Sequence, residues 1–289
     1  MIARYRTAMV SLVLLGVLLP SPALLAQEIY SNEHVKVIRL SNQAYLLTEE
    51  HDYPANCLVI AGEEGLMLID TGFGELGGSL LDALEVLGKP VKVIVNSHAH
   101  EDQMGGNSMF GRDVLFIGHG RCRESYVPSG QQFQNIEKNP TYDFEGNLVF
   151  FIPYVGGHSG CDILTFIPHL NLAHLGDLFL SESFPLVLIE SGSSVETLML
   201  HLNEIFQSLP DNTTMVPGHG KVTSMEYFGG YIGLMEESIE LVQKKMKSGW
   251  SLQRIQDEDV LKKYEKMGQF FPFITKESWI EQIYLSYSQ

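Results

Sequence analysis

The chain has 289 residues, and 45% of them are hydrophobic, which is enough to bury a large core in one α/β domain. Asp and Glu number 35 against 19 Lys and Arg, which gives a formal net charge of −16. A charge of this sign repels phosphate backbones and anionic lipid. Nucleic acids and anionic membrane surfaces are therefore excluded as expected partners.

The first 26 residues are predicted to be a secretory signal. Arg4 and Arg6 precede an apolar run over 9–19, and Ala26 offers a small residue at the cleavage point. The run is too short for a comfortable membrane span, so we expect no stable membrane anchor, with an uncleaved anchor as the alternative. The mature chain, 27–289, is then expected to be periplasmic or secreted. Its oligomeric state stays open.

The chain contains three cysteines, Cys57, Cys122 and Cys161. An exported protein with an odd number of cysteines has at least one thiol that is unpaired within the chain. The sequence does not decide whether two of them form a disulfide, and Cys161 is expected to be a small packed residue. Because no Cys-x-x-Cys spacing occurs, a cysteine-based zinc site is not expected.

Along 27–289 the apolar residues alternate between a period of two and a period of 3.6, which predicts a single α/β domain. Strands are predicted at 35–40, 43–48, 56–61, 65–70, 91–95, 114–117, 148–155, 162–168, 172–176 and 213–216. Helices are predicted at 77–87, at about 102–110, and from a capping box at 193–196 to 209. Residues 121–138 show no clean period and are expected to form a loop with some helix.

Residues 224–289 are predicted to be largely helical. Apolar residues recur at helical spacing from 235 to 246, and Gly249 is placed to end that helix. Ser251 and Thr275 are candidate caps for two further helices. Because each helix needs an apolar partner, we expect this helical extension, 226–289, to pack against a core formed by 35–225.

The strand at 91–95 is followed by a polar segment, SHAHEDQ, that points to a metal site. Side chains alternate along an extended segment, so His98, His100 and Asp102 fall on one side of it. In a helix, His100 would point away from the other two. Imidazole and carboxylate groups that converge in this way are typical metal ligands. The alternative is a polar turn that happens to contain two histidines.

Polar loops also follow other predicted strands. Each joins glycine to a potential ligand: Asp70 in DTG, His158 in GGHSG, Asp177 in GD, and His219 in PGHG. Glycine lets the backbone approach closely and adopt positive φ, as ligand-binding loops commonly require. Together with HAHED, these loops predict a site built at the ends of several strands.

The segments LIDTG, HAHEDQ, GHSG, GDLF and PGHG, in this order and spacing, resemble the metallo-β-lactamase fold superfamily over about residues 35–225. The resemblance implies an α/β fold in which two β-sheets pack face to face with helices outside, an αββα sandwich with a metal site at one edge. It implies a first metal held by His98, His100 and His158, and a second held by Asp102 and His219, with Asp177 bridging both. Asp70 is expected to hold the histidine loop by hydrogen bonds, with a helix cap as the alternative.

One position departs from the family pattern, since Gln103 stands where most hydrolase branches have a histidine. An amide is a much poorer zinc ligand than imidazole, so the second site is expected to be weak, empty or filled by a harder ion. We therefore expect one or two zinc ions, with iron or manganese as alternatives. A metal-bound hydroxide, oriented by Asp102 or Asp177, is predicted to attack a carbonyl carbon.

The predicted activity is zinc-dependent hydrolysis of an ester, thioester or lactam bond in a small-molecule substrate. Asp177 in GDLF resembles the glyoxalase-like hydrolases, whereas the best-known metallo-β-lactamases have a cysteine there. The span 139–220 contains no Lys or Arg, so the substrate is expected to be neutral or held by the metals. Lys221 is interpreted as a solvated turn residue. The alternatives are a true β-lactamase, a mononuclear-iron persulfide dioxygenase and a non-catalytic metal- or ligand-binding protein.

Several further residues are candidates to border the substrate cleft beside the predicted metal site. His51 and Tyr53 precede a predicted strand and are candidate substrate contacts. Ser181, Ser183 and the turn at 191–193 are candidates for its other border. His119 is expected at the surface or behind the ligands rather than as a ligand itself.

Overall fold

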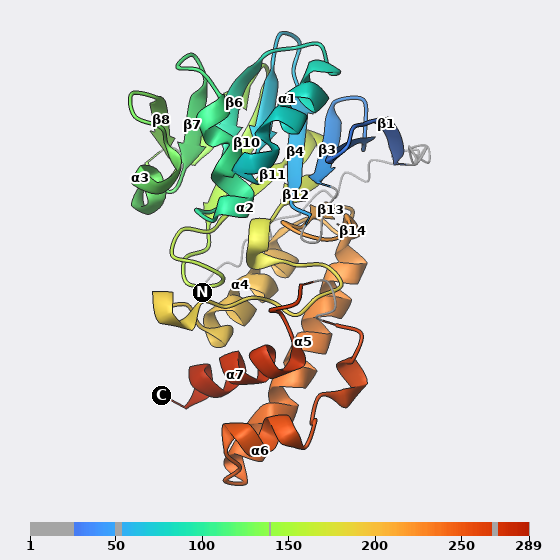
Figure 1. Ribbon diagram of the computed structural model, residues 1–289, viewed down its shortest axis with the longest axis vertical. Helices are drawn as coiled ribbons and strands as arrows, with labels where there is room; N and C mark the ends of the chain where they lie inside the picture. The colour runs from blue at the N-terminus through green and yellow to red at the C-terminus, as the bar shows by residue number, and fades with distance from the viewer. Residues whose placement is uncertain (1–25, 50–53, 139, 268–270, 289) are drawn as a thin grey trace, which may run out of the picture.

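The computed structural model describes residues 26–49, 54–138, 140–267 and 271–288. The predicted signal, except for residue 26, lies outside these ranges, as do His51 and Tyr53. Two β-sheets pack face to face and helices cover their outer faces, so the predicted αββα sandwich is confirmed (Figure 1). In the described part of the chain, no helix has both the length and the apolar character needed to cross a membrane.

The first sheet has eight strands in sequence order. They are β1 (Gln27–Ser31), β2 (Val35–Arg39), β3 (Ala44–Glu49), β4 (Asn56–Ala61), β5 (Leu66–Ile69), β6 (Val91–Val95), β7 (Leu115–Gly118) and β8 (Gln132–Asn135). Strands β1 to β5 pair antiparallel, and β5 to β8 pair parallel. The carboxyl ends of β5 and β6 therefore lie at the same edge of the sheet, which brings Asp70 beside Ser97 and the histidine segment.

The second sheet has six strands in the order β14-β13-β12-β11-β10-β9. They are β9 (Thr141–Phe144), β10 (Asn147–Pro153), β11 (Ile163–Ile167), β12 (Leu172–His174), β13 (Thr214–Val216) and β14 (Thr223–Ser224). Strands β12 and β13 are parallel, whereas β11 runs antiparallel to β12. One edge of this sheet therefore holds the ends of β12 and β13 and the start of β11. Asp177 follows β12, His219 follows β13, and His158 precedes β11, so all three residues lie at that edge.

Strand alternation explains the layers. In β5, Met67 and Ile69 face the space between the sheets, while Leu66 and Leu68 face α1 (Gly77–Glu85) on the outside. Both sets are fully buried, which is why this strand reads as an uninterrupted apolar run. Strand β11 alternates in the same way on the other sheet.

The outer face of the second sheet carries the remaining large helices, α4 (Val195–Ser208), α5 (Met225–Lys247), α6 (Leu252–Asp257) and α7 (Lys276–Tyr287). They share one hydrophobic cluster with the sheet, and Trp279 of α7 is fully buried in it. Figure 1 shows this helical block below the strands, with α7 beside α4 and α5. The predicted caps at Ser251 and Thr275 are both present.

Local differences from the predictions have simple causes. Strands β1, β8, β9 and β14 were not predicted, because each is short and mostly polar and lies at the end of a sheet. The helix expected at 102–110 is a short α2 (Glu101–Met104) continued by a 3-10 turn (Gly105–Met109), since two glycines interrupt it. The cap of α4 is Ser194, whose Oγ accepts from Thr197 N, so the predicted capping box is displaced by one residue.

The structure shows which of the three cysteines are paired. Cys122 and Cys161 form a disulfide, and Cys57 is a buried free thiol. Cys161 is buried, as expected of a packed residue, and its sulfur is also part of the disulfide. The bond ties a 3-10 turn (Gly120–Cys122) after β7 to the loop that carries His158.

Candidate metal centre

Asp70 holds the backbone of the histidine segment by a hydrogen bond. This residue follows β5 in a left-handed conformation with φ of 63°, and its Oδ1 accepts a hydrogen bond from Ser97 N at 2.7 Å. Asp70 is fully buried, and burial raises the pKa of its carboxyl group well above the usual value. Its predicted hydrogen bond to the histidine segment is present. From Ser97 the chain bends through His98 and Ala99, only His100 is extended, and α2 begins at Glu101. The expectation that His98, His100 and Asp102 lie along one extended segment is therefore wrong, because Asp102 belongs to the first turn of a helix.

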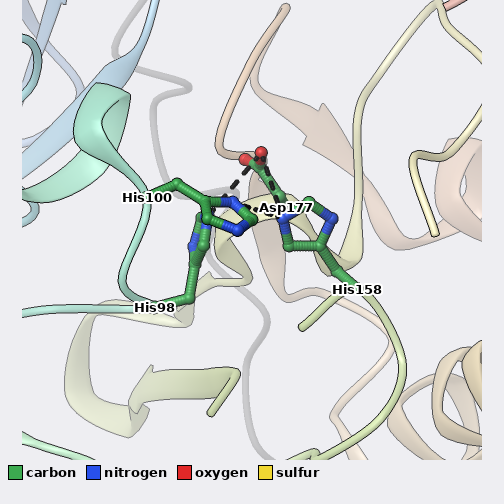
Figure 2. A group of neighbouring side chains, drawn as sticks. All are labelled: His98, His100, His158 and Asp177. Carbon is green, nitrogen blue, oxygen red and sulfur yellow. Dashed lines mark hydrogen bonds and ion pairs between the residues drawn. The ribbon is translucent and has the colours of Figure 1, made fainter. Parts of the chain in front are cut away.

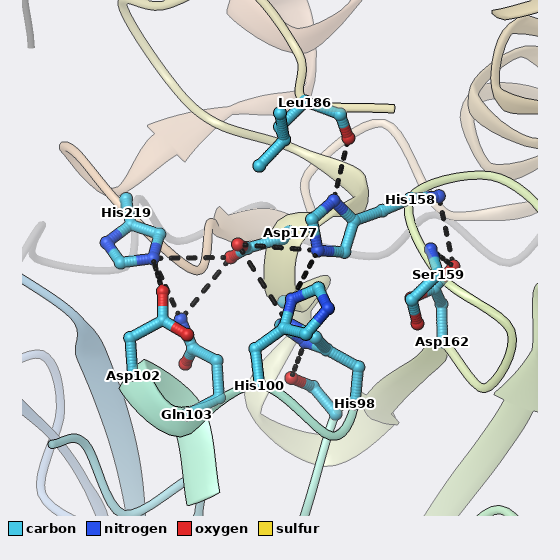
Figure 3. Close-up of polar contacts among 12 residues, drawn as sticks. His98, His100, Asp102, Gln103, His158, Ser159, Asp162, Asp177, Leu186 and His219 are labelled. Carbon is cyan, nitrogen blue, oxygen red and sulfur yellow. Dashed lines mark hydrogen bonds and ion pairs between the residues drawn. The ribbon is translucent and has the colours of Figure 1, made fainter. Parts of the chain in front are cut away.

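His158 is held on a tight loop by Asp162. The Asp162 carboxylate accepts from the backbone N–H groups of His158 at 3.0 Å and Ser159 at 2.7 Å. The ring is oriented by its Nδ1, which donates to the carbonyl oxygen of Leu186 at 2.7 Å (Figure 3). This hydrogen bond leaves the lone pair on Nε2, the atom that faces the other ligands.

The rings of His98, His100 and His158 converge with Asp177 (Figure 2). Neighbouring ring centroids are 4.5 to 4.8 Å apart and the rings are nearly perpendicular. Asp177 Oδ2 lies 3.9 Å from His98 Nε2 and 3.7 Å from His158 Nε2. His158 Nε2 and His100 Nδ1 are 2.9 Å apart. Donors at bond lengths of about 2.0–2.3 Å around a tetrahedral zinc ion are spaced similarly, at roughly 3–4 Å.

The chemistry of these donors fits a cation. His98 Nε2 is buried, points into the group, and has no hydrogen-bond partner within the described ranges. A buried polar atom without a partner is costly, and a metal ion would supply the missing contact. Burial, followed by the proximity of His158 and His100, lowers the pKa of His98 well below its usual value. The imidazole is therefore neutral near pH 7, as a metal ligand must be.

A second group, Asp102, Asp177 and His219, lies against the first and shares Asp177 with it (Figure 3). His219 Nδ1 donates to Pro54 O at 2.9 Å, while Nε2 lies 2.9 Å from Asp102 Oδ2 and 3.5 Å from Asp177 Oδ1. Gly218 must lack a side chain, because a Cβ there would meet Asp177 Oδ1. All six predicted ligand residues are thus brought together at one edge of the sandwich. Their role as ligands stays a prediction.

The loop of His219 is held by Asn56 at the start of β4. The Asn56 amide donates to Pro217 O at 3.0 Å and to Gly220 O at 2.8 Å. Among the protein groups alone, burial would lower the pKa of His219, but Asp177 and the hydrogen bond to Asp102 raise it to about 9. Burial favours the neutral carboxyl group of Asp102, but its hydrogen bond to His219 and the charge of His219 hold the pKa of Asp102 below its usual value. The arrangement is strongly cation-stabilising.

The Gln103 side chain lies between Asp177 and His219 of the second group. Its Nε2 lies 3.0 Å from His219 Nε2 and 3.3 Å from Asp177 Oδ1 (Figure 3). The side chain is fully buried, and within the described chain its Oε1 has no hydrogen-bond partner. The amide thus donates to Asp177 Oδ1 and fills the space next to His219 Nε2 that a second ion would need.

The other candidate cleft residues differ from one another in exposure and in their hydrogen-bond partners. Lys221 is exposed and pairs with Glu182 at 2.8 Å, in agreement with its interpretation as a solvated residue. The Ser181 and Ser183 hydroxyls are buried rather than open to a cleft. Ser193 instead donates to His158 O at 3.2 Å. His119 is buried, and its Nδ1 accepts from Arg121 N.

Sequence reasoning missed three residues that support the ligands: Asn56, Asp162 and Phe271. The Phe271 ring meets the His219 ring edge to face, with centroids 4.8 Å apart. An aspartate four residues after His158 was a usable signal for Asp162, because a short loop lets it accept backbone N–H groups. No sequence signal identifies Phe271, since its contact depends entirely on how the C-terminal helices pack.

Comparison with known proteins places this geometry in context. A sequence model of the metallo-beta-lactamase superfamily matches residues 52–219, which is more than half of the chain. A hydroxyacylglutathione hydrolase from Crocosphaera subtropica is 29% identical over 108 residues, covering 36% of this chain and 40% of that protein. Metallo-beta-lactamase domain-containing protein 1 from Mus musculus is 30% identical over 105 residues, covering 35% and 39%. The match thus spans about two fifths of each curated relative.

Solved structures share the fold at low sequence identity. A metallo-beta-lactamase from Pontibacter korlensis aligns with a TM-score of 0.61 and 22% identity, covering 69% of this chain and 98% of that one. A metallo beta lactamase from Erythrobacter litoralis aligns with a TM-score of 0.59 and 20% identity, covering 72% and 99%. At this identity the alignments support the architecture and carry no assignment of substrate.

Proposed function

Since this chain belongs to the metallo-β-lactamase superfamily, we propose that it is a metal-dependent hydrolase whose centre is formed by His98, His100, His158 and Asp177. One observation carries the proposal above all others. His98 Nε2 is buried and aimed at a group of convergent donors, with no hydrogen-bond partner in the described ranges. We propose zinc as the ion, because three imidazoles and one carboxylate suit it well.

A divalent ion held by these donors would supply Lewis-acid activation of water and of a substrate carbonyl group. The chain's own residues do the rest. His98 and His158 are buried, whereas the Asp102 side chain is 22% exposed and His100 is half-buried, so substrate approaches from the side of these two. We propose that Asp102 accepts the proton of an attacking water and that Asp177 orients this water. His219 holds Asp102 in position through the 2.9 Å hydrogen bond.

We propose that the bond hydrolysed is an ester, thioester or lactam in a small molecule. The similarity to a hydroxyacylglutathione hydrolase supports cleavage of an acyl bond. The sequence span 139–220 has no Lys or Arg, and Lys221 is already paired with Glu182. A substrate that is neutral next to the centre, or whose charge faces the ion, fits these surroundings.

We further propose that the protein is exported and acts in an oxidising compartment. The signal-like composition of residues 1–26 and the Cys122–Cys161 disulfide both support this location, because such bonds persist mainly outside the cytosol. Sequencing the N-terminus of protein recovered from the periplasm or medium tests it directly. An intact Met1 on cytosolic protein would contradict export.

The deciding experiment measures bound metal and then turnover. Protein expressed in medium with balanced zinc, iron and manganese is analysed for metal per chain, and assayed with a thioester, an ester and a chromogenic cephalosporin. Zinc with hydrolysis of an acyl substrate is expected, and His98→Ala or His158→Ala should abolish metal retention. Full metal content in either variant would refute the ligand assignment. Iron with oxygen uptake would favour an oxygenase instead, and turnover of cephalosporin alone a true β-lactamase.

A further inference from the structure

Gln282 is a buried polar residue on the apolar face of α7. Its neighbours on this helix, Trp279, Ile280 and Ile283, are all buried in the hydrophobic cluster, and the glutamine itself is only 8% exposed. A buried amide is costly unless it is hydrogen-bonded. Gln282 Oε1 accepts a hydrogen bond from Val187 N at 2.6 Å. The residue therefore has a specific partner, and that partner leads toward the metal centre.

The partner belongs to the same peptide group that orients His158. The carbonyl of Leu186 and the N–H of Val187 are the two ends of one peptide unit. His158 Nδ1 donates to that carbonyl at 2.7 Å, and Gln282 accepts from that N–H at 2.6 Å. Because a trans peptide is planar and its C=O and N–H point in opposite directions, the three groups form a continuous hydrogen-bond relay. The relay runs from the ligand ring to the C-terminal helix.

We propose that Gln282 is a positioning residue for the metal centre, acting on His158 through the peptide group between Leu186 and Val187. Hydrogen bonds in a chain polarise one another, so an N–H that donates to Gln282 makes the Leu186 carbonyl a better acceptor. A better acceptor fixes the Nδ1–H tautomer of His158 and makes Nε2 more basic toward an ion. This role rests on the proposed function, since it requires a cation at Nε2.

The same helix supplies a matched control. One turn further along α7, Ser286 Oγ accepts from Val195 N at 3.0 Å. This contact also joins an α7 side chain to a backbone N–H of the second half of the chain. It ends at the start of α4, however, and the peptide unit that it holds makes no contact with a ligand ring in the described structure. Removing it tests the general cost of loosening α7.

The experiment compares the mature wild-type chain with Gln282→Met, which keeps the side-chain length but has no oxygen acceptor, and with Ser286→Ala. After each protein is stripped with a chelator, its zinc dissociation constant is measured by competition with a chromophoric chelator, and its cobalt complex by visible absorption. Loss of a partner behind a histidine ligand typically weakens metal binding by 10–100-fold, so we expect roughly tenfold for Gln282→Met. The cobalt spectrum should shift with it. Ser286→Ala should keep the wild-type constant and spectrum.

Three results would overturn the role. Gln282→Met could bind zinc as tightly as wild type, or both variants could weaken binding equally. The third concerns Gln282→Glu, which retains an acceptor oxygen and is the variant to use if the methionine protein does not fold. It is expected to bind zinc at least as tightly as wild type, and a tenfold loss would contradict the relay. Failure of the wild-type chain to bind any divalent ion would instead refute the proposed function itself.

Discussion

The disulfide between Cys122 and Cys161 gives the prediction with the clearest magnitude. The two cysteines are 39 residues apart in sequence, and their bond closes a loop of that size in the unfolded chain. The chain-entropy relation for such a loop gives about 4 kcal/mol of stabilisation of the folded state. Cys122→Ser combined with Cys161→Ser should therefore lower the free energy of unfolding by about this amount.

Urea denaturation monitored by tryptophan fluorescence measures the loss. With a denaturant slope of roughly 3 kcal/mol per M, a loss of about 4 kcal/mol moves the midpoint down by more than about 1 M. Cys57→Ala is the control, because it removes a buried thiol that forms no disulfide and costs only a small packing term. It should keep most of the wild-type midpoint.

A thiol count makes the reasoning refutable without any variant. Oxidised protein unfolded in denaturant should show one reactive thiol, that of Cys57, and all three only after reduction. Three thiols before reduction would refute the bond. A double variant with the midpoint of Cys57→Ala would refute the stabilisation even if the bond forms.

Three further outcomes are expected. Gln103→His replaces an amide that faces Asp177 and His219 with a potential ligand. Metal analysis should then show a rise from about one to about two zinc ions per chain, with faster turnover. An unchanged metal content would refute the blocking role of Gln103, and added metal without turnover would favour a binding protein. Zinc at about 100 times its Kd should stabilise stripped protein by about 2.7 kcal/mol in thermal denaturation, and no shift would contradict the site. Burial lowers the pKa of His174 from 6.5 to about 4, so the unfolded chain binds the extra proton between these values and stability should fall by about 3 kcal/mol as pH drops from 6.5 to 4. His174→Gln should flatten that pH dependence, and an unchanged slope would assign it to other groups.

Residues that specify the site locally were readable from sequence. Strand β5 is a continuous apolar run and β6 is apolar except for Lys92, and each is followed at once by a polar segment that contains Asp70 or His98. Alternation along an extended segment is a local rule, and it predicted that His98, His100 and Asp102 share one side. The structure instead bends at 97–99 and places Asp102 in α2, so the three residues reach the site without that alternation. The convergence with His158, Asp177 and His219 is not local. It came from the family resemblance of the ordered motifs.

Features that depend on tertiary packing were not readable. The disulfide partners lie in loops of no regular period, and three cysteines permit several pairings. Strand β8 has a single apolar residue, Phe133, among polar ones, because it lies at the edge of its sheet and buries little surface. The Gln282 contact is made to a backbone N–H of Val187, and a backbone donor leaves no trace in residue type. Such positions become visible only as buried polar side chains on apolar helix faces.

The division of the ligands between the sheets sets what the core must do. His98, His100 and Asp102 come from one segment after β6 of the first sheet, whereas His158, Asp177 and His219 come from separate loops of the second sheet. Distances within the first set are fixed by one short segment, but every distance between the sets depends on how the two sheets pack. The residues between the sheets, such as Val95 and Ile163, are fully buried and close-packed, so their volume controls the separation of the donors. Metal affinity should accordingly be as sensitive to this inner layer as to the loops themselves.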